Sequence, residues 1–133
     1  MKAVYIISGV PGCGKSTIAK QIAGETGVVC EADAFFYVNG VYEWKPENLK
    51  VVHNKCFDKF KKAIDDGVET VINSNTNATI KEWARYNDYA IENGYTVFKM
   101  IVENFHNNDS IHSVPQKNRE IMADRIKNSM KLI

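Results

Sequence analysis

The chain has 133 residues, of which 44% are hydrophobic and 25% are charged, and its formal net charge is +1. This composition excludes a disordered chain, and the length suffices for one hydrophobic core but not for two. We therefore predict a single domain over residues 1–133. The near-neutral charge argues against tight non-specific binding to nucleic acid, although it leaves room for a local basic patch.

Residues 3–8 form a short apolar, β-branched run bounded by glycine, which predicts a strand buried on both faces. A helix is predicted over residues 16–25 and a second short strand over 28–31. Residues 32–44 are expected to be irregular and are rich in aromatics, with Asn39-Gly40 as a turn signal.

The second half of the chain alternates helices and strands. Pro46 suits the first turn of a helix over residues 46–66, and Thr79 with Glu82 is a capping signal for a helix over 79–93. The other predicted elements are strands over 68–73 and 95–103 and a last helix over 115–131. This alternation predicts an α/β fold with a short parallel sheet and helices on both faces. Ligands of such sheets bind beyond the carboxyl ends of the strands.

Cysteine usage and hydropathy indicate a cytoplasmic protein. The three cysteines, Cys13, Cys30 and Cys56, are too few and too far apart for a disulfide framework or a zinc site, which indicates reduced thiols. No apolar run approaches the roughly 20 residues that cross a bilayer. Residues 4–7 run straight into a glycine loop and so predict a strand rather than a signal peptide. We expect no membrane contact and no obligate protein partner.

The segment from Gly9 to Thr17 matches the phosphate-loop pattern G-x-x-x-x-G-K-[ST] between a predicted strand and a predicted helix. Its glycines let backbone N–H groups surround the β-phosphate, and the helix adds its positive dipole end. Lys15 is expected to reach the β- and γ-phosphates in catalysis, and the Ser16 hydroxyl to ligate Mg²⁺. The residues expected to bind nucleotide are Gly9, Pro11, Gly12, Cys13, Gly14, Lys15, Ser16 and Thr17.

The rest of the chain favours a kinase that uses ATP and Mg²⁺. No N/T-K-x-D guanine signature occurs, and the chain is too short for the extra strands of an ATPase motor. Asp33 follows the second predicted strand, where a carboxylate can take the proton of an attacking hydroxyl as catalytic base. The alternative is a turn or N-cap aspartate. Glu31, one residue off, is expected to face the strand.

Two further groups of residues are candidates for the acceptor side. Asn75, Thr76 and Asn77 could bind the acceptor or orient Asp33, and they could equally form a polar turn into the next helix. Tyr37 and Tyr42 could line the acceptor pocket or form part of the core of a short flap.

In order and spacing these motifs resemble the 5′-hydroxyl polynucleotide kinase branch of P-loop kinases, which includes the kinase domain of bacteriophage polynucleotide kinase and zeta-toxin-like relatives. The resembling segments are Gly9 to Thr17, Asp33 to Phe36, Gly40 to Tyr42, Leu49 with His53, Asn75 to Asn77, Gly94-Tyr95, and His112 to Pro115 with Met122 and Arg125. The resemblance implies a P-loop NTPase three-layer sandwich and a kinase for the 5′-hydroxyl of DNA or RNA, with Asp33 as general base. A phage origin, and hence work in the host cytoplasm, rests on the resemblance alone.

The chain departs from that family twice. Family members usually carry an acid in the segment corresponding to residues 74–77, and an arginine shortly before the segment at 112–115 that clamps the transferring phosphate; both are missing here. We expect Arg125, or else Arg119, to act as the catalytic clamp when a lid over about residues 104–118 closes. The alternative for either arginine is an exposed helix charge.

Two other functions stay open. The acceptor could be a nucleoside, a modified DNA base or another small hydroxyl compound. The protein could also be a catalytically weak nucleotide-binding module, which the missing acid and arginine favour.

Overall fold

Four parallel strands form one sheet in this computed structural model, which describes residues 1–10 and 14–103. The strands are β1 (Ala3–Ser8), β2 (Val28–Cys30), β5 (Thr70–Ser74) and β6 (Thr96–Ile101). Their order is β2-β5-β1-β6, with every neighbouring pair parallel. The predicted lid, the predicted helix over residues 115–131 and its two candidate arginines lie outside the described residues.

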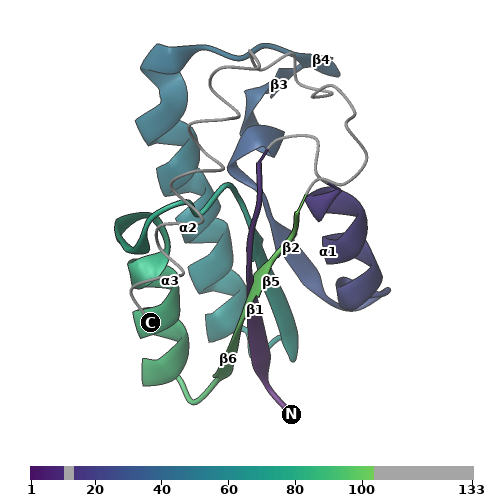
Figure 1. Ribbon diagram of the computed structural model, residues 1–133, viewed down its shortest axis with the longest axis vertical. Coiled ribbons are helices and arrows are strands. Elements are labelled where there is room, and N and C mark those ends of the chain that lie inside the picture. Colours follow the sequence, from purple (N-terminus) through teal and green to yellow (C-terminus); the bar gives the residue numbers. More distant parts are fainter. Residues whose placement is uncertain (11–13, 104–133) are drawn as a thin grey trace.

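Helices cover both faces of this sheet, so the prediction of a three-layer α/β fold is confirmed. α1 (Lys15–Ala23) lies on one side, and α2 (Leu49–Asp65) and α3 (Ile80–Glu92) lie on the other (Figure 1). Ile7 of β1 belongs to the core cluster under α1, whereas Val4 and Ile6 belong to the larger cluster under α2 and α3. Since successive strand residues face opposite sides, both halves of the core need an apolar β1.

The predicted ends of the elements shift by a few residues. The helix expected over residues 16–25 ends at Ala23, where Gly24 takes a positive φ of 60°. The helix expected over 46–66 opens with a separate 3₁₀ turn, η2 (Pro46–Asn48), before α2 begins. Such a turn is common at helix starts, where fewer backbone partners are available.

Residues 32–44 are more regular than the sequence predicted. A 3₁₀ turn, η1 (Ala32–Phe36), leads into an antiparallel hairpin of β3 (Tyr37–Val38) and β4 (Val41–Tyr42). The turn residues Asn39 and Gly40 have φ of 52° and 81°, which is the left-handed backbone that a two-residue hairpin turn requires. The turn signal is therefore confirmed, and the hairpin projects beyond the sheet next to α2 (Figure 1).

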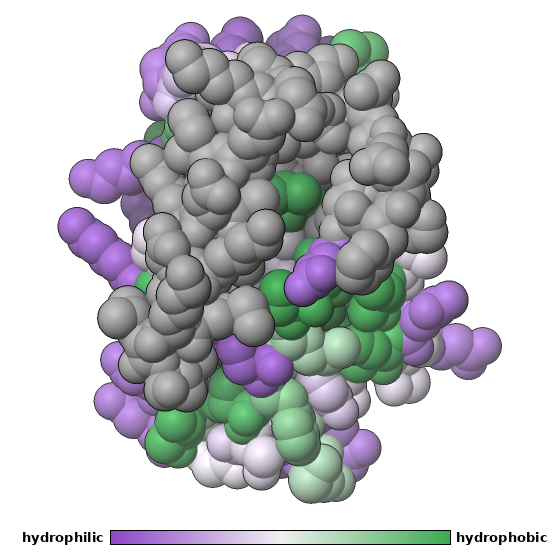
Figure 2. All heavy atoms as spheres, viewed as in Figure 1, coloured by the Kyte–Doolittle hydropathy of each residue, from purple (hydrophilic) through white to green (hydrophobic). Residues whose placement is uncertain are grey.

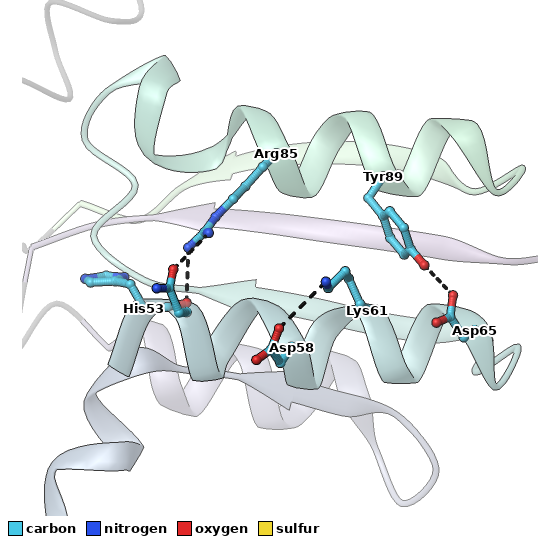
Figure 3. Close-up of polar contacts among 7 residues, drawn as sticks. His53, Asp58, Lys61, Asp65, Arg85 and Tyr89 are labelled. Carbon is cyan, nitrogen blue, oxygen red and sulfur yellow. Dashed lines mark hydrogen bonds and ion pairs between the residues drawn. The ribbon is translucent and has the colours of Figure 1, made fainter. Parts of the chain in front are cut away.

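Arg85 of α3 fastens this helix to α2. Its guanidinium donates hydrogen bonds to the His53 carbonyl at 3.1 Å and to the Asn54 side chain at 3.3 Å, as Figure 3 shows. It also lies over the Phe57 ring, 4.5 Å from the centroid. Further along the same pair of helices, the Tyr89 hydroxyl donates to Asp65 (Figure 3). These contacts hold α3 against α2.

Hydrophobic residues also reach the surface. Figure 2 shows them gathered near the centre of the face viewed there. Phe98 of the edge strand β6 is 40% exposed and stacks on Tyr5 of β1, with ring centroids 5.2 Å apart. No helix within residues 1–10 and 14–103 is long and apolar enough to span a membrane.

Thr79→Ala is expected to lower the free energy of unfolding by about 1 kcal/mol. The Thr79 side chain accepts the backbone N–H of Glu82, and the Glu82 carboxylate accepts the backbone N–H of Thr79 at 2.7 Å. The two residues thus form the predicted capping box at the start of α3, and alanine removes the first of these bonds. Urea denaturation followed by circular dichroism measures the change. Thr26→Ala, at an exposed threonine outside any helix or strand, is the control and should stay within about 0.5 kcal/mol of wild type. Equal losses in both variants would refute the capping role.

Candidate active site

The phosphate loop follows β1, and polar residues follow β2 and β5, at the edge where the carboxyl ends of these strands meet. Gly9 comes after β1, Glu31 and Asp33 after β2, and residues 75–77 after β5. The backbone N–H of Gly9 donates to the Thr76 carbonyl at 3.2 Å, so the segments after β1 and β5 lie side by side. This is the edge at which parallel sheets bind ligands.

The described part of the phosphate loop has the backbone that its sequence requires. Gly14 caps α1 in the left-handed conformation, with φ of 98°, and a Cβ at this position would meet nothing within 4 Å. The backbone angle rather than crowding therefore selects glycine here. Lys15 and Ser16 begin α1 half-buried, while Thr17 is exposed. Pro11, Gly12 and Cys13, which we expected to bind nucleotide, lie outside the described residues.

Glu31 contacts the phosphate loop directly, and the expectation that it simply faces the strand is wrong. The Ser16 hydroxyl donates a hydrogen bond of 2.8 Å to the Glu31 carboxylate. The alternation along β2 explains the contact: Val29 packs in the α1 cluster and Cys30 in the opposite one. The next residue therefore returns to the α1 side, where Ser16 lies.

Asp33 lies in the first turn of η1. Its charge acts on Tyr42 of the hairpin, whose pKa is raised to about 12, mainly by removal from water and secondly by Asp33. Removal of the imidazole from water lowers the pKa of His53 at the start of α2, and the charges of Glu82 and Asp33 oppose that shift. Glu31 and Asp33 are two residues apart but act on different groups. Glu31 contacts Ser16, and the charge of Asp33 acts on Tyr42 and His53.

A cluster of three asparagine side chains underlies this edge. The Asn75 side chain accepts the backbone N–H of Ala32 at 2.8 Å and donates to Asn73. The first contact holds the start of η1, and with it Asp33, against the end of β5. This arrangement agrees with the orienting role considered for Asn75.

Asn77 joins the same cluster to the start of the phosphate loop. Its side-chain amide donates to the Ile7 carbonyl at 2.9 Å and to Asn73 at 3.2 Å. The Ser8 hydroxyl in turn donates to the Asn77 carbonyl at 3.0 Å. Asn77 has φ of 45° and is 3% exposed. A buried amide with these partners supports the loop from below, and acceptor binding by Asn75, Thr76 and Asn77 stays a prediction.

Lys99 is a residue of this edge that the sequence analysis missed. Its ammonium donates to the Ser8 hydroxyl and lies over the Trp83 ring, 5.1 Å from the centroid. Removal from water lowers the pKa of Lys99. No motif marks this lysine, because its place beside Ser8 depends on β6 pairing with β1.

The aromatic residues around the hairpin divide between core and surface. Phe36 is buried, and Tyr42 packs against the same core with its ring 6.1 Å from that of Phe36. Tyr37 is 50% exposed and meets the Tyr42 ring edge-on at 5.3 Å. Trp44 is exposed as well. Tyr37 and Trp44 therefore present ring surface to solvent in the segment that follows Asp33.

The oxygen donors at this edge suit Mg²⁺, a hard cation that keeps several waters and takes few protein ligands. The Ser16 hydroxyl and the Glu31 carboxylate lie within hydrogen-bond distance of each other and can offer it oxygen atoms. No group of three or more histidine, cysteine or acidic side chains in the described part of the chain gathers as a metal site would require. The residues present therefore fit a water-rich Mg²⁺ site and not a dedicated protein cage.

Comparisons with known proteins agree with this architecture. Human NEDD4-binding protein 2 is 29% identical over 85 residues, which make up 62% of this chain and 5% of that protein. The fold is similar to that of a cysteine-to-alanine variant of APS kinase CysC from Mycobacterium tuberculosis. The TM-score is 0.50 at 10% identity, and the match covers 95% of this chain and 97% of that one.

The family model of the viral superfamily 1 RNA helicase core domain matches residues 5–88. That range is more than half of the chain and includes most of β1, the phosphate loop, both carboxylates after β2 and the asparagine cluster. The chain therefore belongs to this family of P-loop NTPases.

Proposed function

We propose that this protein is an ATP-dependent kinase that transfers the γ-phosphate to a hydroxyl, best the 5′-hydroxyl of a polynucleotide. The observation that carries the proposal is that the two carboxylates after β2, Glu31 and Asp33, act on different groups. Glu31 contacts Ser16 of the phosphate loop, while the charge of Asp33 acts on Tyr42 and His53. Asp33 is thus a second carboxylate, besides the one at Ser16, that can take the proton of an attacking hydroxyl.

In the proposed mechanism, the backbone N–H groups of the loop and Lys15 hold the β- and γ-phosphates. The Ser16 hydroxyl would hold Mg²⁺ bound with ATP, and the cation would neutralise part of the phosphate charge. Asp33 accepts the proton of the acceptor hydroxyl as its oxygen bonds to the γ-phosphorus. The bond between that phosphorus and the β–γ bridging oxygen breaks, and ADP leaves. Arg125 or Arg119, on the predicted helix after the lid over residues 104–118, is proposed to clamp the transferring phosphoryl group when the lid closes.

The exposed aromatic rings support a polynucleotide acceptor. Tyr37 and Trp44, in the segment that follows Asp33, are each about half exposed. Base stacking on such rings is worth about 1–3 kcal/mol per base and tolerates any sequence. A terminal base resting there would bring its own 5′-hydroxyl toward Asp33. The chain's net charge of +1 suits an acceptor held at its end rather than along its backbone.

A second candidate is an NTPase stimulated by nucleic acid. The match to the viral superfamily 1 RNA helicase core over residues 5–88 favours it. In this reading water attacks the γ-phosphate, and a polynucleotide acts as the stimulating partner and not as the acceptor.

Incubation with γ-labelled ATP and Mg²⁺ separates the candidates. The panel consists of 5′-hydroxyl DNA and RNA oligonucleotides, the same oligonucleotides with 5′-phosphates, modified DNA, and nucleosides. We expect label on the 5′-hydroxyl ends, and none on the 5′-phosphorylated controls. Mobility on denaturing gels and thin-layer chromatography of the nucleotides distinguish transferred label from released phosphate.

Three other outcomes would contradict the favoured function. Free labelled phosphate that increases with any oligonucleotide would indicate the NTPase. Label on nucleosides or on internal modified bases would indicate a small-acceptor kinase. ATP binding without transfer or hydrolysis would indicate a nucleotide-binding module.

A further inference from the structure

Ser16 needs a carboxylate that accepts a hydrogen bond from its hydroxyl if the hydroxyl oxygen is to hold Mg²⁺. A hydroxyl carries one proton and two lone pairs, so it can ligate a cation only while its proton points elsewhere. In P-loop NTPases an acid from a neighbouring strand completes the metal site. The end of β5 has only Asn73, Ser74 and Asn75. The asparagines among them are already engaged with one another and with Ala32.

We propose that Glu31 is the carboxylate that completes the Mg²⁺ site, supplied from the end of β2 in place of the missing acid at β5. The inference rests on the nucleotide binding of the proposed function, but not on its acceptor. The Ser16 hydroxyl donates its proton to Glu31 at 2.8 Å, which leaves the oxygen lone pairs for the cation. The hydrogen bond and the metal bond are therefore compatible, and the carboxylate also offers an oxygen to a metal-bound water.

The charges around Glu31 agree with this role. The ion pairs among residues 1–10 and 14–103 are Lys61–Asp58 and Lys62–Asp66, both on or beside α2. No lysine or arginine in those ranges lies within ion-pair distance of Glu31. A half-buried carboxylate with no ion-pair partner among these residues favours the binding of a cation.

Glu31→Gln tests the charge without removing the hydrogen-bond acceptor. The glutamine oxygen can still accept the Ser16 proton, whereas the negative charge is gone. We expect Mn²⁺, used as a probe in the presence of a non-hydrolysable ATP analogue, to bind about 10–100-fold more weakly, as is typical of supporting residues around metals. Binding of the same analogue in EDTA is expected to stay equal or tighten, because a carboxylate beside the phosphates repels metal-free nucleotide. Electron paramagnetic resonance counts bound Mn²⁺, and calorimetry measures both affinities.

This pair of opposite effects separates a metal role from a structural one. A variant that only disturbs the loop would weaken analogue binding in EDTA and in Mn²⁺ alike, and that result would overturn the proposal. Unchanged Mn²⁺ affinity would overturn it as well. Glu69→Gln, at an exposed glutamate next to the opposite end of β5, is the matched control and should behave as wild type.

Ser16→Ala with and without Glu31→Gln provides a second measurement. If the two side chains act on one cation, their losses in Mn²⁺ affinity should not add, whereas full additivity would contradict the proposal. If wild-type protein binds no nucleotide under any condition, the proposed function fails together with this inference. If wild type binds nucleotide and Glu31→Gln leaves the metal affinity intact, the inference alone fails.

Discussion

Asp33→Asn is expected to lower the turnover of phosphoryl transfer by about 10²–10⁴-fold, the usual contribution of a general base. Asparagine keeps the shape of the side chain but cannot take the proton of the attacking hydroxyl. Binding of the ATP analogue is expected to change little, because the charge of Asp33 acts on Tyr42 and His53 while Glu31 contacts the phosphate loop. Transfer of labelled phosphate and calorimetric analogue binding measure the two quantities.

Asp58→Asn is the matched control, because Asp58 is an exposed carboxylate of α2 whose ion pair with Lys61 lies on the helix surface. Such a pair contributes little, so both transfer and stability should stay near wild type. A wild-type turnover in Asp33→Asn would remove the general base from the mechanism. A loss of analogue binding as large as the loss of transfer would move Asp33 to the nucleotide side.

The layered fold could be predicted because its signals are local. The apolar run of β1, the capping box of Thr79 and Glu82, and the turn signal at Asn39-Gly40 each act within a few residues and are all found in the structure. The hairpin strands could not be predicted in the same way. Each has two residues, which is too short for an alternating pattern to be read.

In the candidate site, too, the features that depend on nearby residues could be predicted and the long-range ones could not. The Gly9 to Thr17 motif and the position of Asp33 after β2 follow from the sequence alone. The position of Glu31 beside Ser16 could also have been predicted, because alternation from Val29 and Cys30 returns residue 31 to the α1 side. The position of Lys99 could not have been predicted, because its contact with Ser8, 91 residues away, requires β6 to pair with β1. A pattern of alternating strands and helices does not give the order of the strands in the sheet.

Asn77→Asp is expected to lower the free energy of unfolding by about 3–5 kcal/mol at neutral pH, the cost typical of an uncompensated buried charge. The substitution places a carboxylate oxygen against the Ile7 carbonyl at a position that is 3% exposed. Asn39→Asp is the matched control, because Asn39 is also left-handed, with φ of 52°, but is exposed in the hairpin turn. Its change should stay within about 0.5 kcal/mol.

The pH dependence of Asn77→Asp follows from the same contact. Burial beside a carbonyl oxygen favours the neutral acid, so the pKa of the new carboxyl in the folded protein should lie above its unfolded value of about 3.9. The folded state then binds the proton more tightly than the unfolded state. Relative to wild type, stability should be recovered as pH falls below the folded pKa and lost as pH rises through it. Urea denaturation of both proteins from pH 4 to 8, taken as about the range that brackets such a shift, measures the difference. A deficit independent of pH would mean that loss of the amide donor to the Ile7 carbonyl, and not a buried charge, destabilises the variant.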